Sequence, residues 1–529
     1  MTVGNSEAFD VVVVGGGTSG CIVAARLSED PTMRVLLVED GPDPQPLPEV
    51  IADPKRQAEL VLSSPYVRLY EAERQDGSPL PLLSGRVMGG GSSVNNLAAV
   101  RPMACDFEAW SAFGGEAWSY AAMLPLMRAI ERDDDFADDP LHGDAGPLVL
   151  SRGFRLDDPG DPPVRALIEA AGALGLPPCP DINQPAPFGV CASPYAIRDD
   201  RRQSSAVAYL DPARQRPNLT VLPETTVARV LLDGRRARGV EVVGRDGVRR
   251  IAAGVVVLAA GVYHSPQLLQ LSGVGPEAEL RRLGVPVVAP LDGVGQNYRD
   301  HAVVYVTFEG TTELREEWVI PKVRLIARSR PDLAAPDLHV FMRPTVRVAG
   351  LPPMLPVSLH LLEHRSAGRV RLASADPSAL PEVEPALCEH PDDVRALVDG
   401  IALAARLAAQ PPLAAYYGPM LTPAATDDWE EHVRTTYDTY HHGVGTCRVG
   451  RDDDPGAVVD SSLQVHGLEG LFVADASVLP TVPHANTNLA AMLVGEVAAR
   501  VVAGRAMPLG PAASPTVGAS PAAGVVGPR

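Results

Sequence analysis

The sequence predicts an α/β protein in which a discontinuous domain built on a parallel sheet is interrupted by a second, α+β domain with an antiparallel sheet. Buried β-branched runs followed by glycine or acidic residues, far apart along the chain, predict the first domain. Alternating apolar and polar residues between those runs predict the second. At 529 residues the chain also exceeds one ordinary domain of about 100–200 residues, so two or three lobes are expected.

The first strand–turn–helix unit lies near the N-terminus. Residues 9–14 (FDVVVV) are a continuous apolar run that suits a strand buried on both faces. Residues 21–28 have the composition of a helix, and residues 34–39 (RVLLVE) form a second buried run. Together they predict a βαβ unit of about 30 residues, the opening of a Rossmann-like domain.

Further strands of this kind appear much later in the chain. Residues 255–260 (VVVLAA) predict a buried strand that continues into a helix over 265–271, and residues 471–474 (LFVA) predict another, followed by a helix over 489–503. Between them, alternation at 303–308 and 338–343 predicts antiparallel strands. The simplest architecture gathers one domain from several distant segments.

Composition excludes some functions. A net charge of −19 argues against nucleic acid, whose binders need a basic face. No run approaches the roughly 20 apolar residues of a membrane helix. Residues 1–7 lack the features of a signal peptide, so a cytoplasmic location is expected.

Three further segments or residue classes have simple interpretations. The acidic run 131–139 predicts a solvated surface loop. Residues 506–529, rich in Pro, Ala and Gly, predict a disordered tail. No cysteine pair has CxxC spacing, so isolated, reduced thiols are expected and neither a zinc site nor a disulfide framework. The cysteines are Cys21, Cys105, Cys179, Cys191, Cys388 and Cys447.

The turn after the first strand carries the pattern GxGxxG, formed by Gly15, Gly17 and Gly20. These glycines permit a tight turn, close approach of a pyrophosphate and close helix–strand packing. Thr18 and Ser19 stand at the helix N-terminus, whose N–H groups favour phosphate. Glu39, 19 residues after Gly20, suits the ribose hydroxyls and disfavours a 2′-phosphate. The turn therefore predicts FAD or NAD rather than NADP, without separating the first two.

Five motifs, taken in their order along the chain, distinguish FAD from NAD. They are GRVMGGGSSVN at 85–95, GVYHSPQLLQLSGVG at 261–275, GVGQNYRDH at 293–301, HHGVGTC at 441–447 and GLFVADASVLPTVPHANTNLAAMLVGE at 470–496. In this order they resemble the glucose-methanol-choline (GMC) family of FAD-dependent oxidoreductases, from about residue 9 to residue 502. Met88 and Val262 depart mildly from the family pattern. The branch is left open, including a bacterial branch associated with the peptide-derived carrier mycofactocin.

The resemblance implies a domain plan and a cofactor state. Residues 1–150, 205–300 and 443–505 would form the FAD-binding domain, and residues 151–204 and 301–442 the substrate-binding domain. Some members bond FAD through a histidine just before the asparagine that ends the motif at 85–95. Val94 occupies that position here, so a noncovalent FAD is expected.

The resemblance also implies the residues around the cofactor. Ser92, Asn95 and Ala98 should lie near the isoalloxazine or pyrophosphate, Val227 at the adenine, and Asp475 at the ribityl and phosphate stretch. The remaining positions expected to contact FAD are Met88, Ala260, Ala476 and Thr487.

For catalysis the resemblance implies His442, directly before the glycine segment, as the base that takes the hydroxyl proton while a hydride leaves for flavin N5. Asn486, ten residues before Glu496, would be its partner and stabilise alkoxide charge. His484 is the competitor for that second role, and His441 is expected to be packed or to act indirectly. Structural roles are expected for His264, His301 and His466, and no metal at His432, Asp438 and His441.

The implied function is oxidation of the CH–OH group of a small-molecule alcohol, with oxygen, a quinone or a redox protein as electron acceptor. Three alternatives remain open. One is a lyase that keeps FAD as structure and cleaves cyanohydrins. Another is a flavin photoenzyme that decarboxylates fatty acids, and the third is an NAD enzyme using only the first βαβ unit. The region 301–440 carries no motif that identifies a substrate.

Overall fold

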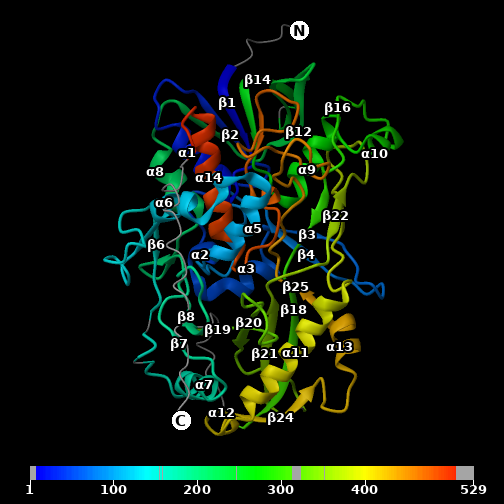
Figure 1. The fold of residues 1–529 in the computed structure, drawn as a ribbon. Coiled ribbons are helices and arrows are strands. Elements are labelled where there is room, and N and C mark those ends of the chain that lie inside the picture. The colour runs from blue at the N-terminus through cyan, green and yellow to red at the C-terminus, as the bar shows by residue number, and fades with distance from the viewer. Residues whose placement is uncertain are drawn as a thin grey trace, which may run out of the picture.

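The structure is a computed structural model, and it describes residues 8–153, 155–157, 159–245, 247–311, 323–350 and 352–507. Two sheets lie one beyond the other along its long axis, the parallel one in the upper half of Figure 1 and the antiparallel one in the lower half. The expectations for the N-terminal residues 1–7 and for the tail from residue 508 lie outside the described residues. Within them, no helix is long and apolar enough to cross a membrane.

The upper sheet is the expected parallel one. Strands far apart in sequence are its neighbours: Val11 pairs with Val35 on one side and with Val255 on the other. Its order from edge to edge is β11 (Leu219–Leu222), β2 (Val35–Val38), β1 (Ala8–Val14), β14 (Gly247–Leu258), β13 (Arg236–Gly244) and β12 (Thr226–Asp233), with β26 (Leu471–Val473) paired to β14. The last three-strand stretch, β12 to β14, is an antiparallel meander.

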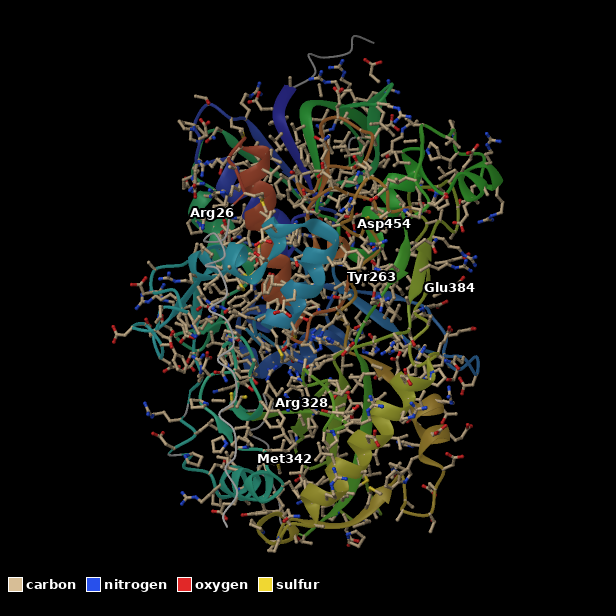
Figure 2. All side chains as sticks on the ribbon, viewed as in Figure 1. Arg26, Tyr263, Arg328, Met342, Glu384 and Asp454 are labelled. Atoms are coloured by element: carbon tan, nitrogen blue, oxygen red, sulfur yellow. The ribbon has the colours of Figure 1, made fainter. Side chains whose placement is uncertain are left out.

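Two helices from opposite ends of the chain cover this sheet. They are α1 (Thr18–Leu27) and α14 (Thr487–Val502). Gly495 lets them approach closely, because a Cβ there would stand 3.0 Å from the carbonyl oxygen of Ser19. Arg26, labelled beside them in Figure 2, forms an ion pair with Glu496 at 2.9 Å. The two ends of the chain thus pack together beside one sheet.

The lower sheet is antiparallel except at one edge, where β7 and β8 run parallel. Its order is β24 (Tyr417–Thr422), β18 (Ala302–Gly310), β21 (Met354–Leu361), β20 (Leu338–Met342), β19 (Val323–Ala327), β8 (Gly189–Ala192) and β7 (Pro178–Cys179), with β25 (Asp438–Thr439) paired to β18. The strands expected at 303–308 and 338–343 are β18 and β20. The exact division of the chain into two domains stays a prediction.

The two faces of the lower sheet differ. Leu338 and Leu359 lie under α11 (Pro391–Ala408), close to Gly400, and belong to an apolar core. The opposite face carries Arg324, His339 and His360, all buried. The other helices of eight or more residues in the described chain are α5 (Ala104–Gly114), α6 (Tyr120–Ile130), α7 (Pro162–Ala173), α9 (Gly261–Leu271) and α13 (Trp429–Thr436).

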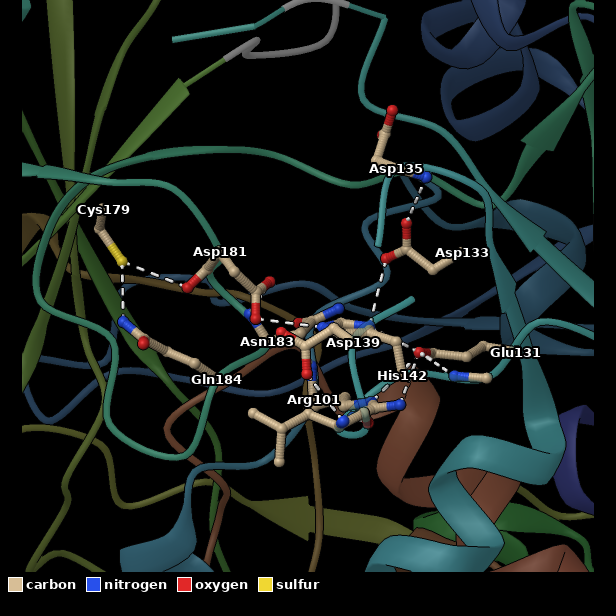
Figure 3. Close-up of polar contacts among 12 residues, drawn as sticks. Arg101, Glu131, Asp133, Asp135, Asp139, His142, Cys179, Asp181, Asn183 and Gln184 are labelled. Atoms are coloured by element: carbon tan, nitrogen blue, oxygen red, sulfur yellow. Dashed lines mark hydrogen bonds and ion pairs between the residues drawn. The ribbon is translucent and has the colours of Figure 1, made fainter. Parts of the chain in front are cut away.

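The prediction of a solvated loop over the acidic run 131–139 is wrong at its start. Glu131 and Asp133 are buried, as ends of the short strand β5 (Glu131–Asp133). Arg101 and Arg152 supply the counter-charges, with Nη2 of Arg101 2.6 Å from Glu131 and Nη1 of Arg152 2.8 Å from Asp133. Figure 3 shows the part of this network around Arg101, Glu131, Asp133 and His142. The sequence pattern missed it because both arginines lie well outside the run.

The cysteines are not all isolated. Cys179 on β7 and Cys191 on β8 are direct neighbours in the strand register. Hydrogen bonding to Cys191 lowers the pKa of the Cys179 thiol to about 7. Both are free thiols, as are the four others.

Candidate active site

Two glycine-rich turns pack against each other at the edge of the parallel sheet. Gly15 has a φ of +101°, and a Cβ there would stand 2.5 Å from the carbonyl oxygen of Ala259. Gly90 has a φ of +51°, and its Cβ would stand 2.7 Å from Cα of Gly17. Gly89 N–H also donates to the carbonyl of Gly16 at 2.6 Å. The GxGxxG turn at 15–20 and the motif at 85–95 therefore form one continuous backbone surface.

Some glycines in these turns have no neighbour that requires them. A Cβ at Gly17 would find its nearest protein atom at 3.8 Å, and one at Gly91 would find none within 4 Å. Space that a Cβ would fill, beside backbone N–H groups, is what close approach of a ligand needs. Since α1 and α14 also both begin without a side-chain cap, their first N–H groups are open to an anionic partner. The surroundings therefore fit a dinucleotide with a pyrophosphate.

Glu39 stands at the end of β2 beside this surface. Its carboxylate accepts hydrogen bonds from the N–H groups of Gly16, at 2.7 Å, and Gly41, at 2.8 Å. Burial raises the pKa of Glu39 to about 7, although both N–H groups lower it. Met88 lies over the same turn, because a Cβ on Gly16 would meet its sulfur at 2.5 Å. Both predicted cofactor residues thus border the glycine turn.

The loop that follows the second glycine turn is held in place by hydrogen bonds from Arg202. Arg202 is buried and donates to the carbonyls of Ile51, Ser92 and Asn95. It also donates to the amide oxygen of Asn95 at 3.0 Å, which accepts from Leu97 N–H as well. The oxygen of Asn95 is therefore committed to the protein, and its NH2 group is the one available to a ligand. Sequence reasoning missed Arg202.

The other predicted cofactor residues have these positions. Asp475 accepts from Gly261 N–H at 2.9 Å and from Ser265 Oγ at 2.6 Å. Ser92 Oγ donates to Gly89 at 2.6 Å. Ala98 pairs with Tyr195, Val227 lies in β12, Ala260 precedes α9, Ala476 begins a short 3₁₀ turn and Thr487 begins α14.

His442 and Asn486 lie side by side, although 44 residues separate them. Asn486 Nδ2 is 3.3 Å from His442 Nε2. The amide oxygen of Asn486 accepts from Nη1 of Arg324 at 2.8 Å. Because a guanidinium only donates, Asn486 must turn its oxygen to Arg324 and its NH2 to His442. The imidazole must then accept at Nε2, so this nitrogen carries no proton.

The opposite edge of the His442 ring requires the same tautomer. Its Nδ1 lies 2.8 Å from Nδ1 of His301, and His301 Nε2 lies 2.9 Å from the carbonyl oxygen of Pro483. A carbonyl only accepts, so the proton of His301 is on Nε2 and its Nδ1 accepts from His442 Nδ1–H. The contacts on the two sides of the ring therefore give the same result: His442 is protonated at Nδ1 and unprotonated at Nε2.

Asp300 holds this pair of histidines through their backbone. It is fully buried and accepts from the N–H groups of His301, at 2.7 Å, and His442, at 2.8 Å. Tyr298 and Thr439 donate to its other oxygen. Asp300 and the role of His301 were missed from sequence, although both close the motif at 293–301. The sequence did offer one signal: Asp300 and His301, a hydrogen-bond acceptor next to a residue that can donate and accept, stand together at the end of that motif.

The charge state of His442 follows from its surroundings. Burial lowers its pKa to about 3, and the neighbouring His441 and Arg324 lower it as well. The ring is therefore neutral at physiological pH, with an unprotonated nitrogen facing an amide donor. Such an arrangement can take a proton from a hydroxyl group that lies between Nε2 and the amide.

His484, the predicted competitor, is paired elsewhere. Its Nδ1 lies 2.6 Å from Asp106, and although burial opposes the charge, Asp106 raises the pKa of His484 well above its usual range. His441 is exposed and accepts from Leu83 N–H at 3.4 Å. Of the two roles expected for it, the packed one is therefore wrong, and an indirect role stays a prediction. His264 is hydrogen-bonded through Nε2 to the hydroxyl of Tyr70 at 2.7 Å, and His466 bonds to the carbonyl of Gly450 and to Asp452.

Two groups of side chains have the spacing of metal ligands among the described residues. They are Cys105, Asp106 and His484, and Glu131, Asp133 and His142. In the second, Arg101 and Arg152 already neutralise the carboxylates. In the first, Asp106 also caps α5 through Met103 N–H. Neither therefore offers the uncommitted negative charge that a cation needs.

Comparisons with known proteins agree on one family. The models of the N- and C-terminal parts of GMC oxidoreductases match residues 9–303 and 364–495. The chain is 36% identical to 5-(hydroxymethyl)furfural oxidase of Methylovorus sp. (strain MP688), over 92% of this chain and 97% of that one. It is 34% identical to mitochondrial choline dehydrogenase of Mus musculus, over 95% of this chain and 90% of that one.

Solved structures agree as well. Pyridoxine 4-oxidase from Mesorbium loti superposes with a TM-score of 0.88 at 30% identity, over 94% of this chain and all of that one. The superposition covers nearly the whole chain, so it spans both sheets.

Proposed function

The chain belongs to the GMC oxidoreductase family, and from this premise we propose that it is an FAD-dependent enzyme that oxidises the CH–OH group of an alcohol to a carbonyl. The observation that carries the proposal is the bare Nε2 of His442 facing the amide of Asn486. Relatives named for the oxidation of hydroxymethylfurfural, choline and pyridoxine support the reaction type.

The residues that would hold FAD surround the two glycine turns. The first turn and the open N-terminus of α1 would bind the pyrophosphate, Glu39 the ribose, and Asn95 and the N-terminus of α14 the flavin end. When bound, FAD supplies the acceptor for the hydride of the alcohol carbon. Val94 offers no nucleophile for a covalent bond, so FAD is held noncovalently.

His442 and Asn486 divide the work on the substrate hydroxyl. His442 Nε2 takes the hydroxyl proton, and its Nδ1–H stays bonded to His301 throughout. Asn486 donates to the substrate oxygen as negative charge builds there, and Arg324 fixes the direction of that donor. Asp300 keeps both histidines in place through their backbone N–H groups.

The test is anaerobic mixing of the purified, flavin-loaded protein with a panel of primary and secondary alcohols. Bleaching of the oxidised flavin absorbance and formation of the carbonyl support the proposal. If the flavin stays oxidised and cyanide is released from a cyanohydrin, the protein is a lyase instead. If a fatty acid loses carbon dioxide only in light, the protein is a photodecarboxylase instead. A preparation without flavin absorbance would contradict the cofactor. Reoxidation by oxygen or a quinone then identifies the acceptor.

A further inference from the structure

The polar face of the lower sheet is buried beside the catalytic pair. The strand register puts Ile326 opposite His339, His339 opposite His360, and Phe341 opposite Ser358. Residues directly opposite each other share a face, and alternate residues along a strand do too, so Arg324 belongs with them. All these side chains are buried. A sheet face this polar and this buried needs a partner.

Two guanidinium groups meet at one ring on this face. The guanidinium carbon of Arg324 lies 5.1 Å from the centre of the Phe341 ring, and that of Arg343 lies 5.5 Å from it. Arg324 is 1% exposed, and donates to Ser193 and Asn486, which are both neutral. Arg343 donates to the neutral Ser358 at 2.9 Å. Within the described part of the chain, neither arginine has a carboxylate at ion-pair distance.

The buried carboxylates that contact the catalytic His442 and the competitor His484 are already occupied. Asp300 accepts from the backbone of His301 and His442 and from two hydroxyl groups. Asp106 is paired with His484 and accepts from Met103 N–H. Burying a charged group without a counter-charge is costly, so Arg324, which is 1% exposed, indicates a ligand that brings negative charge. The half-buried Arg343 adds a second positive group beside it.

Two histidines beside the arginines are also short of partners. Nε2 of His339 and Nδ1 of His360 are buried and have no hydrogen-bond partner among the described residues. These side chains are 1% and 0% exposed. Buried polar atoms are nearly always paired, so unpaired ones at the edge of a site point to atoms of a ligand. Both rings adjoin Phe341, at 6.1 Å and 4.9 Å between ring centres.

We propose that Arg324, Arg343 and the neighbouring histidines His339 and His360 bind a carboxylate group of the substrate, which makes the enzyme specific for alcohols that also carry an acid. This rests on the proposed function, because the hydroxyl end of the same molecule lies at His442 and Asn486.

A role in orienting Asn486 explains only part of this arrangement. Arg324 alone would serve that purpose, through one of its nitrogens. Arg343 and the unpaired histidine nitrogens contribute nothing to it. A cationic alcohol such as choline would meet two positive groups and no acid here, so the substrate class differs from that of the choline-named relative. The overall charge of −19 does not prevent this, since the field inside a buried site is set by its nearest groups.

The experiment compares alcohols that differ in one charge. Anaerobic flavin reduction is followed by rapid mixing with 4-(hydroxymethyl)benzoate, its neutral methyl ester, and choline. We expect the carboxylate to exceed the ester by at least about 10-fold in the ratio of reduction rate constant to dissociation constant, since one charge-assisted hydrogen bond is worth about that factor. Choline should be the poorest. Equal values for the carboxylate and the ester would overturn the proposal.

Variants assign the effect to the site. Arg343→Met should lower the carboxylate-to-ester ratio toward one. Arg328→Met is the matched control: Arg328 is also half-buried and also lies over a ring, 4.8 Å from the centre of Phe188. It should keep the wild-type ratio. A ratio that survives Arg343→Met, or that falls equally in both variants, would contradict the assignment.

A binding measurement separates this inference from the proposed function. Benzoate cannot be oxidised, and its binding is followed by calorimetry or by the change in the flavin spectrum. If no alcohol reduces the flavin but benzoate binds and Arg343→Met weakens it, the anion site holds and the oxidoreductase proposal fails. If the ester reduces the flavin and benzoate does not bind, the oxidoreductase proposal holds and the anion site fails.

Discussion

His301 and His442 meet through their Nδ1 atoms, 2.8 Å apart. Two such nitrogens can share only one proton, and the carbonyl of Pro483 decides which ring supplies it. The proton is on His442 Nδ1, and the nitrogen that faces Asn486 is therefore free. A protein carbonyl two contacts away thus sets the tautomer of the catalytic ring.

Removing the acceptor on His301 should slow the reaction. In His301→Ala, the His442 ring loses the partner that fixes its tautomer and angle, and flavin reduction should fall by about 10²-fold, the cost of a misplaced reacting group. His301→Asn, whose amide oxygen can take the place of Nδ1, should recover part of the rate. Rapid-mixing absorbance measures both, and equal losses in the two variants would show that the shared proton is irrelevant.

A negative charge at position 486 should make the rate constant for flavin reduction fall at acidic pH. The pKa of His442 is lowered to about 3, so the wild-type ring stays neutral and the rate constant for flavin reduction should be flat between about pH 5 and 8. In Asn486→Asp a carboxylate beside the ring raises that pKa, so the rate should fall as the pH drops through the new value. Asn486→Ala, which adds no charge, should be slow without this fall at acidic pH. A flat profile in Asn486→Asp would contradict the contact.

The buried network around His142 should make stability depend on pH. Burial opposes the charged ring, but hydrogen bonds to Asp181 and Glu131 raise the pKa of His142 to about 9 from 6.5. The folded state therefore holds a proton that the unfolded state releases, so the stabilisation is complete below pH 6.5 and is lost as the pH rises through about 9. It amounts to on the order of 3 kcal/mol.

Urea unfolding at several pH values measures this. The free energy of unfolding of the wild type should fall over that range, and His142→Gln should remove most of the fall. His390→Gln, at an exposed histidine, is the control and should keep it. A wild-type curve that is flat on the alkaline side would show that His142 is neutral in the fold.

FAD should be dissociable. Val94 lies where a covalent attachment would need a nucleophilic side chain. Precipitation of the protein with acid should release the yellow colour into the supernatant, with the spectrum of free FAD. Colour that remains in the pellet would show a covalent bond formed elsewhere.

Most of the fold could be predicted from sequence, because buried parallel strands and glycine turns are local patterns. The expected strand at 471–474 is β26, and the expected helix over 489–503 is α14. The resemblance also chose His442 and Asn486, which the structure brings together.

What the sequence could not predict depends on pairing between distant segments. Glu131 and Asp133 looked like part of a solvated acidic loop, because their arginine partners are remote in sequence. The polar sheet face escaped notice since Arg324 and His339 become neighbours only through strand register. His301 looked structural because nothing in the sequence shows that its ring reaches His442.

The most direct test of the central claim is anaerobic flavin reduction in His442→Ala. The variant should keep its FAD and show the flavin spectrum of the wild type, while reduction by an active alcohol slows by about 10²- to 10⁴-fold, the usual contribution of a general base. His441→Ala, at the exposed neighbouring position, should reduce at the wild-type rate. A flavin-loaded His442→Ala variant that is reduced as fast as the wild type would contradict the account.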